Sequence, residues 1–251
     1  NLQVSDICLQ PLAAGTIALS KDEKNMGVAL IDVGGGCTTV SVFGNDHLIS
    51  TSVISLGGDN ITKDLSIGLR TSTEEAEDIK LNYGHAFYDH ASEEETFEVS
   101  IIGSNTRETY NQLQISDMIE ARLEEIYAYV EREIRKMGYG ELPGGYVLTG
   151  GTSSMPGSLE LAEDLFRSNV RVAIPDYIGV REAQYTAGIG ILQFAYHNAK
   201  IQGKDLYPSV VEDTTEPKPK RPQKQPKVKK ETKENKKKDS SFANLFKYFF
   251  D

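Results

Sequence analysis

The stretch "MGVALIDVGGGCTTVSVFGNDHLISTSVISL", residues 26–56, constrains the fold more than any other part of the chain. Its first part is a continuous apolar run that stops at glycines, as a buried strand does. Its second part alternates apolar and polar residues around Gly-Asn-Asp at 44–46, which predicts a hairpin with strands near 38–43 and 48–55. A sheet therefore lies at the centre of the fold.

Helices and further strands are predicted by helical spacing, capping residues and glycine stops. The strongest helix covers residues 115–140, where Asp117 favours the start, Gly138 ends the helix, and apolar residues recur every three or four positions. The recurring apolar residues are Ile115, Met118, Ile119, Leu123, Ile126, Tyr127, Val130 and Ile134. Other helices are predicted at 7–19, 57–69, 71–84 and 182–200, a strand at 96–102, and a strand, glycine turn and helix within 144–166.

The composition of the 251-residue chain is that of a globular protein with one large domain or two small ones. No apolar run approaches the ~18 to 20 residues of a membrane-spanning helix, and the first residues lack the pattern of a signal peptide. Because the chain starts with Asn and not Met, we expect a fragment or a processed product.

The cysteines and histidines do not predict a metal or redox site. Cys8 and Cys37 have no metal or redox spacing, and we expect free thiols in a reducing cytosol. The four histidines are scattered and form no HExxH motif, which argues against a catalytic or metal-binding histidine.

Charge divides the chain into an acidic body and a basic tail. Residues 1–216 carry 15 basic and 33 acidic residues, a net charge of −18, whereas residues 217–251 carry 12 basic and 4 acidic residues, a net charge of +8. From about 208 onward, proline, lysine and glutamate replace apolar residues, so we expect residues 208–239 to be a disordered basic linker. A basic tail implies an anionic partner, either nucleic acid or anionic lipid.

The first glycine-rich stretch is "IDVGGGCTTV", residues 31–40, in which an acid ends the buried strand before three glycines and two threonines. Glycines let backbone N–H groups approach an anion, and such loops cradle phosphates. The threonine hydroxyls can donate to phosphate oxygens, and the Asp32 carboxylate could hold Mg²⁺ through water. A glycine-rich hairpin with a capped strand end explains the same residues.

The second glycine-rich stretch is "YVLTGGTSSMPGSLELAEDLF", residues 146–166, in which a buried strand ends in two glycines before a helix. A flat ring can lie against glycines because no side chain intervenes, although an ordinary strand-to-helix turn uses the same residues. The two stretches lie more than a hundred residues apart, and neither a Rossmann GxGxxG unit nor a Walker loop is present.

Together the two stretches resemble the ATPase superfamily that contains actin, the heat-shock chaperones and hexokinase. The pattern is Asp-x-Gly-x-Gly/Cys-x-Thr on a hairpin and, far downstream, Gly-Gly-Thr/Ser-x-x-Pro-Gly; "LTGGTSSMPG" is similar to the adenosine motif of actin. Within the superfamily, the chain is most similar to the bacterial cell-division family FtsA, which ends in a flexible linker and an amphipathic membrane-targeting helix. The resemblance covers residues 1–207 and the character of the tail.

This resemblance implies the second half of an actin-like, ribonuclease H-like α/β fold, a mixed sheet flanked by helices, followed by a disordered tail and a terminal amphipathic helix. The first phosphate loop, the first connecting helix and the inserted subdomain of the family would lie upstream. Residues 1–56 with 143–207 would form the nucleotide-binding subdomain IIA, and residues 57–142 subdomain IIB. In "EAQYTAGIGIL", similar to the second connecting helix, Gly188 and Gly190 would allow close helix crossing.

Carried over residue by residue, the resemblance implies a site for ATP and Mg²⁺. Its phosphate motif would comprise Asp32, Gly34, Gly35, Gly36, Thr38 and Thr39, and its adenosine motif Gly150, Gly151, Thr152 and Ser153. Cys37 lies where relatives carry another small residue, and we expect its side chain to be packed. Glu77 and Lys80 match the helix that contacts ribose and adenine in the family, or they form a solvated pair instead.

The end of the chain, residues 240–251, forms an apolar stripe if it is placed on a helix. The stripe comprises Phe242, Leu245, Phe246, Phe249 and Phe250. A helix of about 11 residues is marginal in water and would fold on meeting an apolar surface, whereas ordering the proline-containing linker to dock it on the body would be costly. Upstream lysines add attraction to anionic lipid, so the stripe favours a membrane surface over nucleic acid.

The resemblance therefore implies the C-terminal part of an FtsA-like, ATP-binding protein that anchors the FtsZ ring to the cytoplasmic face of the cell membrane at the division site and self-associates into actin-like filaments. Hydrolysis would be slow or absent, because no residue resembles a strong general base. The resemblance implies that the FtsZ C-terminal tail binds subdomain IIB, where Arg107 and Arg122 would contact it or form surface ion pairs. A kinase and a chaperone-like or pilus-associated ATPase of the same superfamily are the alternatives.

Overall fold

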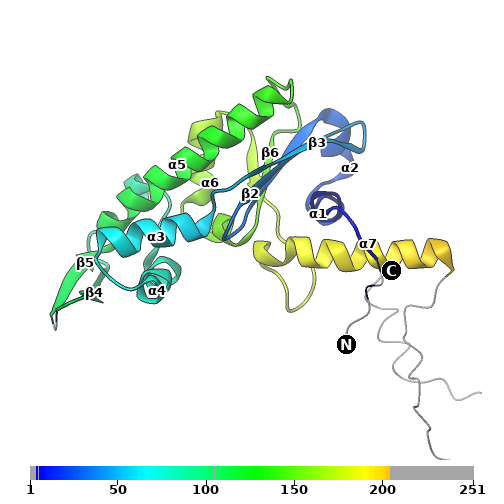
Figure 1. Cartoon of the computed structure of the whole chain (residues 1–251). Coiled ribbons are helices and arrows are strands. Elements are labelled where there is room, and N and C mark those ends of the chain that lie inside the picture. The colour runs from blue at the N-terminus through cyan, green and yellow to red at the C-terminus, as the bar shows by residue number, and fades with distance from the viewer. Residues whose placement is uncertain (1–3, 5, 105, 204–251) are drawn as a thin grey trace, which may run out of the picture. The chain divides into compact units, whose positions relative to one another are not determined.

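The computed structural model describes residues 4, 6–104 and 106–203 of the protein, and a five-stranded mixed sheet forms its centre (Figure 1). The strands are β1 (Val28–Val33), β2 (Thr38–Gly44), β3 (His47–Ile54), β6 (Tyr146–Thr149) and β7 (Val170–Val172). β1 lies in the middle because it pairs antiparallel with β2 and parallel with β6. β3 and β7 are the edge strands.

The predicted hairpin is confirmed as β2 and β3, and the predicted buried strand as β1. The turn residues Asn45 and Asp46 have φ angles of 51° and 64°, the left-handed conformation that a two-residue hairpin turn requires at both positions. Apolar side chains of β1 are buried on both faces of the sheet, so helices must cover both faces.

Two groups of helices provide this cover (Figure 1). On one face, α1 (Gln10–Ala18) packs with its buried alanines against β1, and α7 (Thr186–Gln202) packs against α1. α2 (Lys21–Met26) precedes β1 and begins at a capping box in which Ser20 and Glu23 bond reciprocally. On the other face lie α5 (Gln112–Lys136) and α6 (Ser158–Phe166).

Residues 58–111 supply a second, two-stranded antiparallel sheet and two further helices. These elements are α3 (Gly58–Gly68), α4 (Thr73–Tyr83), β4 (Thr96–Ser100) and β5 (Arg107–Asn111). Their apolar side chains join those of α5 in one core, which continues into the larger sheet. The long helix α5 therefore runs beside both sheets.

The start of α5 differs from the prediction. The helix begins at Gln112 and not near Asp117, because Asn111 caps it: the Asn111 side chain accepts from the Gln114 N–H at 2.9 Å, and Gln114 reaches back to the Asn111 N–H at 3.0 Å. The predicted end is confirmed, since Gly138 follows the last turn with a φ of +91°. Seven of the eight apolar residues predicted to face the core are buried, and Met118 packs against it partly buried.

Of the two glycines expected at a helix crossing, only Gly190 has that role. A Cβ atom at Gly190 would collide with the Ala13 carbonyl of α1, whereas a Cβ atom at Gly188 would meet nothing within 4 Å. The two helices therefore cross in contact at a single glycine. Among the described residues, no helix is long and apolar enough to span a bilayer.

Candidate functional site

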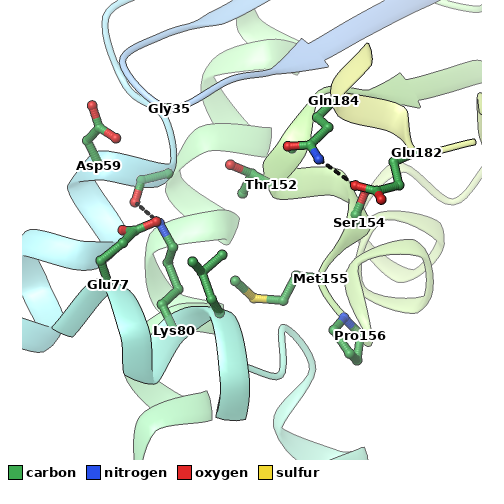
Figure 2. A pocket seen from close by; sticks show the side chains of 13 residues that line it. Gly35, Asp59, Glu77, Lys80, Thr152, Ser154, Met155, Pro156, Glu182 and Gln184 are labelled. Atoms are coloured by element: carbon green, nitrogen blue, oxygen red, sulfur yellow. Dashed lines mark hydrogen bonds and ion pairs between the residues drawn. The ribbon is translucent and has the colours of Figure 1, made fainter. Parts of the chain in front are cut away.

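A pocket of about 380 Å³ brings together the two glycine-rich stretches and α4 (Figure 2). It lies where the loop after β1, the start of α3 and the turn after β6 converge. The residues that line it are Gly35, Gly58, Asp59, Glu77, Lys80, Leu81, Gly151, Thr152, Ser154, Met155, Pro156, Glu182 and Gln184. Of the predicted site residues, Gly35, Glu77, Lys80, Gly151 and Thr152 therefore line one cavity.

Backbone hydrogen bonds hold the first glycine-rich stretch against the start of α3. The Gly58 and Asp59 N–H groups donate to the Gly34 and Gly35 carbonyls, each at 2.9 Å. The Thr152 hydroxyl also donates to the Gly34 carbonyl, at 3.3 Å. A Cβ atom at Gly57 would collide with both carbonyls, so the close approach requires glycine there.

Asp32 lies at the end of β1, half-buried between α1 and the second glycine-rich stretch. The Gln10 side chain donates to the Asp32 carboxylate at 2.5 Å. Gly150 has a φ of +91°, and a Cβ atom on it would collide with the same carboxylate. Burial raises the pKa of Asp32, and the Gln10 hydrogen bond partly opposes that shift. The two glycine-rich stretches thus meet at this side chain.

Lys80 of α4 is only 8% exposed, and at the wall of the pocket it donates hydrogen bonds to three acceptors. Its ammonium group donates to Glu77 at 2.7 Å, to the Thr62 hydroxyl at 2.8 Å and to the Gly58 carbonyl at 3.2 Å. Partial burial alone would raise the pKa of Glu77, but the hydrogen bonds from Lys80 and Thr62 lower it overall. The pair is therefore partly buried and fixed in place.

The remaining predicted residues of the two stretches lie outside the pocket lining. Thr38 is buried and its hydroxyl donates to the Leu56 carbonyl at 2.8 Å. Ser153 is likewise buried and donates to the Gly150 carbonyl at 2.7 Å within its own turn. Thr39 is half-buried opposite Asp32 in the β1–β2 pair.

Cys37 and the arginines complete the account of the predicted residues. Cys37, expected to be packed, is exposed, and so is the neighbouring Gly36. Arg107 pairs with Glu98 at 3.1 Å, and Arg122 pairs with Asp64 at 2.6 Å; neither arginine lines the pocket. Within the described residues no group of three or more His, Cys, Asp or Glu side chains could hold a metal ion.

Sequence reasoning missed several lining residues, namely Gly58, Asp59, Leu81, Ser154, Met155, Pro156, Glu182 and Gln184. Some signals were available: Leu81 lies one helical turn after Glu77, and Ser154, Met155 and Pro156 directly follow the predicted residues Thr152 and Ser153 in the second glycine-rich stretch. Glu182 and Gln184 belong to "EAQYTAGIGIL", but the resemblance of that stretch indicated a helix crossing and not a pocket wall. They reach the pocket because the chain returns to the end of β6.

The match to a family model decides to which protein family the chain belongs. The model named "FtsA: Cell division protein FtsA" matches residues 29–190. The chain belongs to the FtsA cell division protein family. Bacillus subtilis FtsA is 61% identical over 206 residues, which are 82% of this chain and 47% of the relative. Pseudomonas aeruginosa FtsA is 38% identical over 200 residues, 77% of this chain and 48% of the relative. The chain thus spans about half the length of these FtsA relatives.

Solved structures show that the fold is actin-like. MreB5 of Spiroplasma citri bound to ADP matches with a TM-score of 0.64 at 18% identity, over 77% of this chain and 60% of that chain. The MamK double helical filament matches with a TM-score of 0.57 at 15% identity, over 74% and 58% of the two chains. The predicted α/β fold with a mixed sheet flanked by helices is confirmed. The predicted linker 208–239 and terminal helix 240–251 lie outside the described residues.

Proposed function

We propose that this FtsA-family chain forms one wall of an ATP site in an actin-like cell-division protein. The observation that carries the proposal is the single pocket that joins Gly35, Thr152 and Lys80 from three distant parts of the sequence. An actin-like relative of the fold, MreB5, is described as bound to ADP, which supports a nucleotide in this pocket. The family model and the named relatives favour cell division over the kinase and chaperone alternatives.

In this proposal, the loop at residues 34–36, with Thr39 at the start of β2, approaches the phosphates. Glu77 and Lys80 face the ribose, and residues 150–153 form the turn against which the adenine ring lies. Asp32 offers a single half-buried carboxylate, which fits a magnesium ion held mainly by water and phosphate oxygens. When bound, the ion would neutralise phosphate charge, while Gln10 and Gly150 hold the carboxylate in position.

The nucleotide would act mainly as a ligand for assembly, with slow or absent hydrolysis. We assign residues 1–56 with 143–207 to subdomain IIA and residues 57–142 to subdomain IIB, because the larger sheet takes all its strands from the first set. Self-association into actin-like filaments is supported by the fold shared with the MamK filament.

Two contacts of the whole protein complete the proposal. The terminal stripe of Phe242, Leu245, Phe246, Phe249 and Phe250 would hold the protein peripherally on the anionic, cytoplasmic face of the cell membrane at the division site. The FtsZ C-terminal tail would bind residues 57–142. We propose no nucleic-acid partner, because the apolar stripe beside the basic tail favours a membrane surface. Arg107 is the better candidate contact, because it is more exposed than Arg122, which Asp64 and Glu125 hold.

Nuclear magnetic resonance of the ¹⁵N-labelled chain tests the nucleotide site. Titration with Mg-ATP should shift the amide signals of Gly35, Lys80 and Thr152 in a saturable way, with a dissociation constant on the order of millimolar, since the chain spans half of its relatives. Signals of the distant residue Arg107 should not move. Saturable binding that leaves the three pocket residues unchanged would contradict the site, and micromolar affinity would contradict the single-wall description.

A further inference from the structure

One end of the pocket carries a pair of polar side chains to which the proposal above gives no role. Glu182 and Gln184 both line the pocket, and the Gln184 amide nitrogen donates a hydrogen bond to the Glu182 carboxylate. Figure 2 shows the amide nitrogen turned toward Glu182 and the amide oxygen on the side of Thr152. An ionised carboxylate and an amide oxygen only accept hydrogen bonds, so this end of the pocket is rich in acceptors.

The backbone between the two side chains is anchored to the end of the central sheet. Ala183 is buried, and its carbonyl accepts from the Thr149 hydroxyl at 3.1 Å and from the Gly150 N–H at 3.3 Å. The short turn closes with a hydrogen bond from the Tyr185 N–H to the Glu182 carbonyl at 3.1 Å. The two acceptors therefore project from a fixed turn beside the second glycine-rich stretch.

An apolar surface lies next to the acceptors within the same pocket. Met155, Pro156 and Leu81 of α4 line it, and Leu81 is 71% exposed. Aliphatic side chains of this kind contact the faces of a flat ring, whereas polar groups at the margin of a pocket select the ring's edge. A base lying on these side chains would therefore present its edge to acceptors.

We infer that Glu182 and Gln184 determine base specificity by accepting hydrogen bonds from the exocyclic amino group of adenine. This inference rests on the proposed nucleotide site. The amino group of adenine carries two N–H bonds, one for each acceptor. Guanine and hypoxanthine place a carbonyl oxygen beside a ring N–H, so one of the two acceptors would face another acceptor and lose its hydrogen bond.

Three nucleosides test the inference on the chain as it exists. Adenosine and purine riboside share the ring system, but purine riboside lacks the amino group, and inosine replaces it with a carbonyl. In ¹⁵N titrations we expect adenosine to bind about tenfold more tightly than either, a difference of about 1.4 kcal/mol. Equal affinity for adenosine and purine riboside would overturn the inference, and so would tighter binding of inosine.

Substitutions at Glu182 and Gln184 test whether these two side chains cause the preference for adenosine. Glu182→Ala and Gln184→Ala should each lower adenosine affinity toward that of purine riboside, whose own affinity stays unchanged. Glu163→Ala removes an exposed carboxylate of α6 outside the pocket and should keep the tenfold ratio. A ratio retained in both pocket variants would overturn the assignment. If adenosine does not bind at all at about 20 mM, the proposed nucleotide site fails, and the inference with it.

Discussion

Asp32 carries a carboxylate in a place where a carboxylate costs stability. Burial raises its pKa, which means that the folded state prefers the protonated form more than the unfolded chain does. Below the unfolded-state pKa of about 3.9 the carboxyl is protonated in both states and its burial costs nothing. As pH rises from there through the higher folded-state pKa, the free energy of unfolding falls. A half-buried acid at the meeting point of two glycine-rich stretches is typical of a site that uses the charge.

The substitution Asp32→Asn should separate stability from binding. At pH 7 the variant should melt a few degrees higher than the wild type, because the buried charge is gone while the side-chain oxygen can still accept from Gln10. Near pH 3 the two melting temperatures should converge. In a chain of the full length of its relatives, the same substitution should weaken Mg-ATP binding about tenfold. Calorimetry at both pH values measures the difference in melting temperature. A variant that melts below the wild type at pH 7 would contradict the prediction that the buried charge costs stability.

Lys80 should contribute to stability through its three acceptors. In Lys80→Met the acceptors on Glu77, Thr62 and Gly58 lose their donor, so the free energy of unfolding should fall by about 1–3 kcal/mol. Lys63→Met, on the exposed side of α3, should change it by less than about 0.5 kcal/mol. Urea unfolding compares the two midpoints at an unchanged slope. Equal effects of the two substitutions would show that the Lys80 hydrogen bonds do not stabilise the fold.

At the scale of elements, two glycines of α7 form a matched pair. Gly190→Ala places a methyl group against the Ala13 carbonyl and must push α1 and α7 apart, so it should destabilise the protein by about 2 kcal/mol or more. Gly188→Ala meets nothing and should stabilise the protein by up to about 1 kcal/mol through helix propensity. Thermal unfolding followed by circular dichroism measures both. Shifts of the same sign would contradict the crossing described here.

Elements were predictable where a long local pattern exists. The hairpin turn at Asn45 and Asp46 and the apolar periodicity of α5 are visible in the sequence because backbone sterics and helical spacing act locally. The three-residue strand β7 is too short to carry a period, and its place is set by pairing with β6. The start of α5 was missed because its capping residue, Asn111, is also the last residue of β5.

At the scale of the whole molecule, the site could be predicted only where a motif carries its own chemistry. Gly35 and Thr152 belong to glycine-rich stretches, and Lys80 to a helix with a recognisable pattern. Glu182 and Gln184 lie in a stretch whose pattern indicates helix crossing and not ligand binding, and a tertiary hydrogen bond from Gly150 to Ala183 holds that stretch at the pocket. Thr38 belongs to the first motif by its position in the sequence, whereas its burial beside β1 and β3 depends on strand pairing that a local pattern does not give.

The proposed membrane attachment concerns the whole chain and is tested at this scale. Phe246→Glu with Phe249→Glu places two charges in the middle of the apolar stripe, which holds positions i, i+3, i+4, i+7 and i+8 from Phe242. Each substitution removes an anchor worth up to ~1.5–3 kcal/mol and puts a carboxylate at the lipid boundary, so the double variant should no longer sediment with anionic vesicles.

A substitution confined to the two upstream serines provides the control: Ser240→Ala with Ser241→Ala leaves the stripe intact and should still sediment. The folded body should keep its melting temperature in both variants, because we expect the proline-containing residues 208–239 to act as a linker between it and the stripe. A double glutamate variant that still sediments would leave the lysines as the anchor. One that melts early would show that the stripe packs on the body, and membrane attachment through this segment would fail as an explanation.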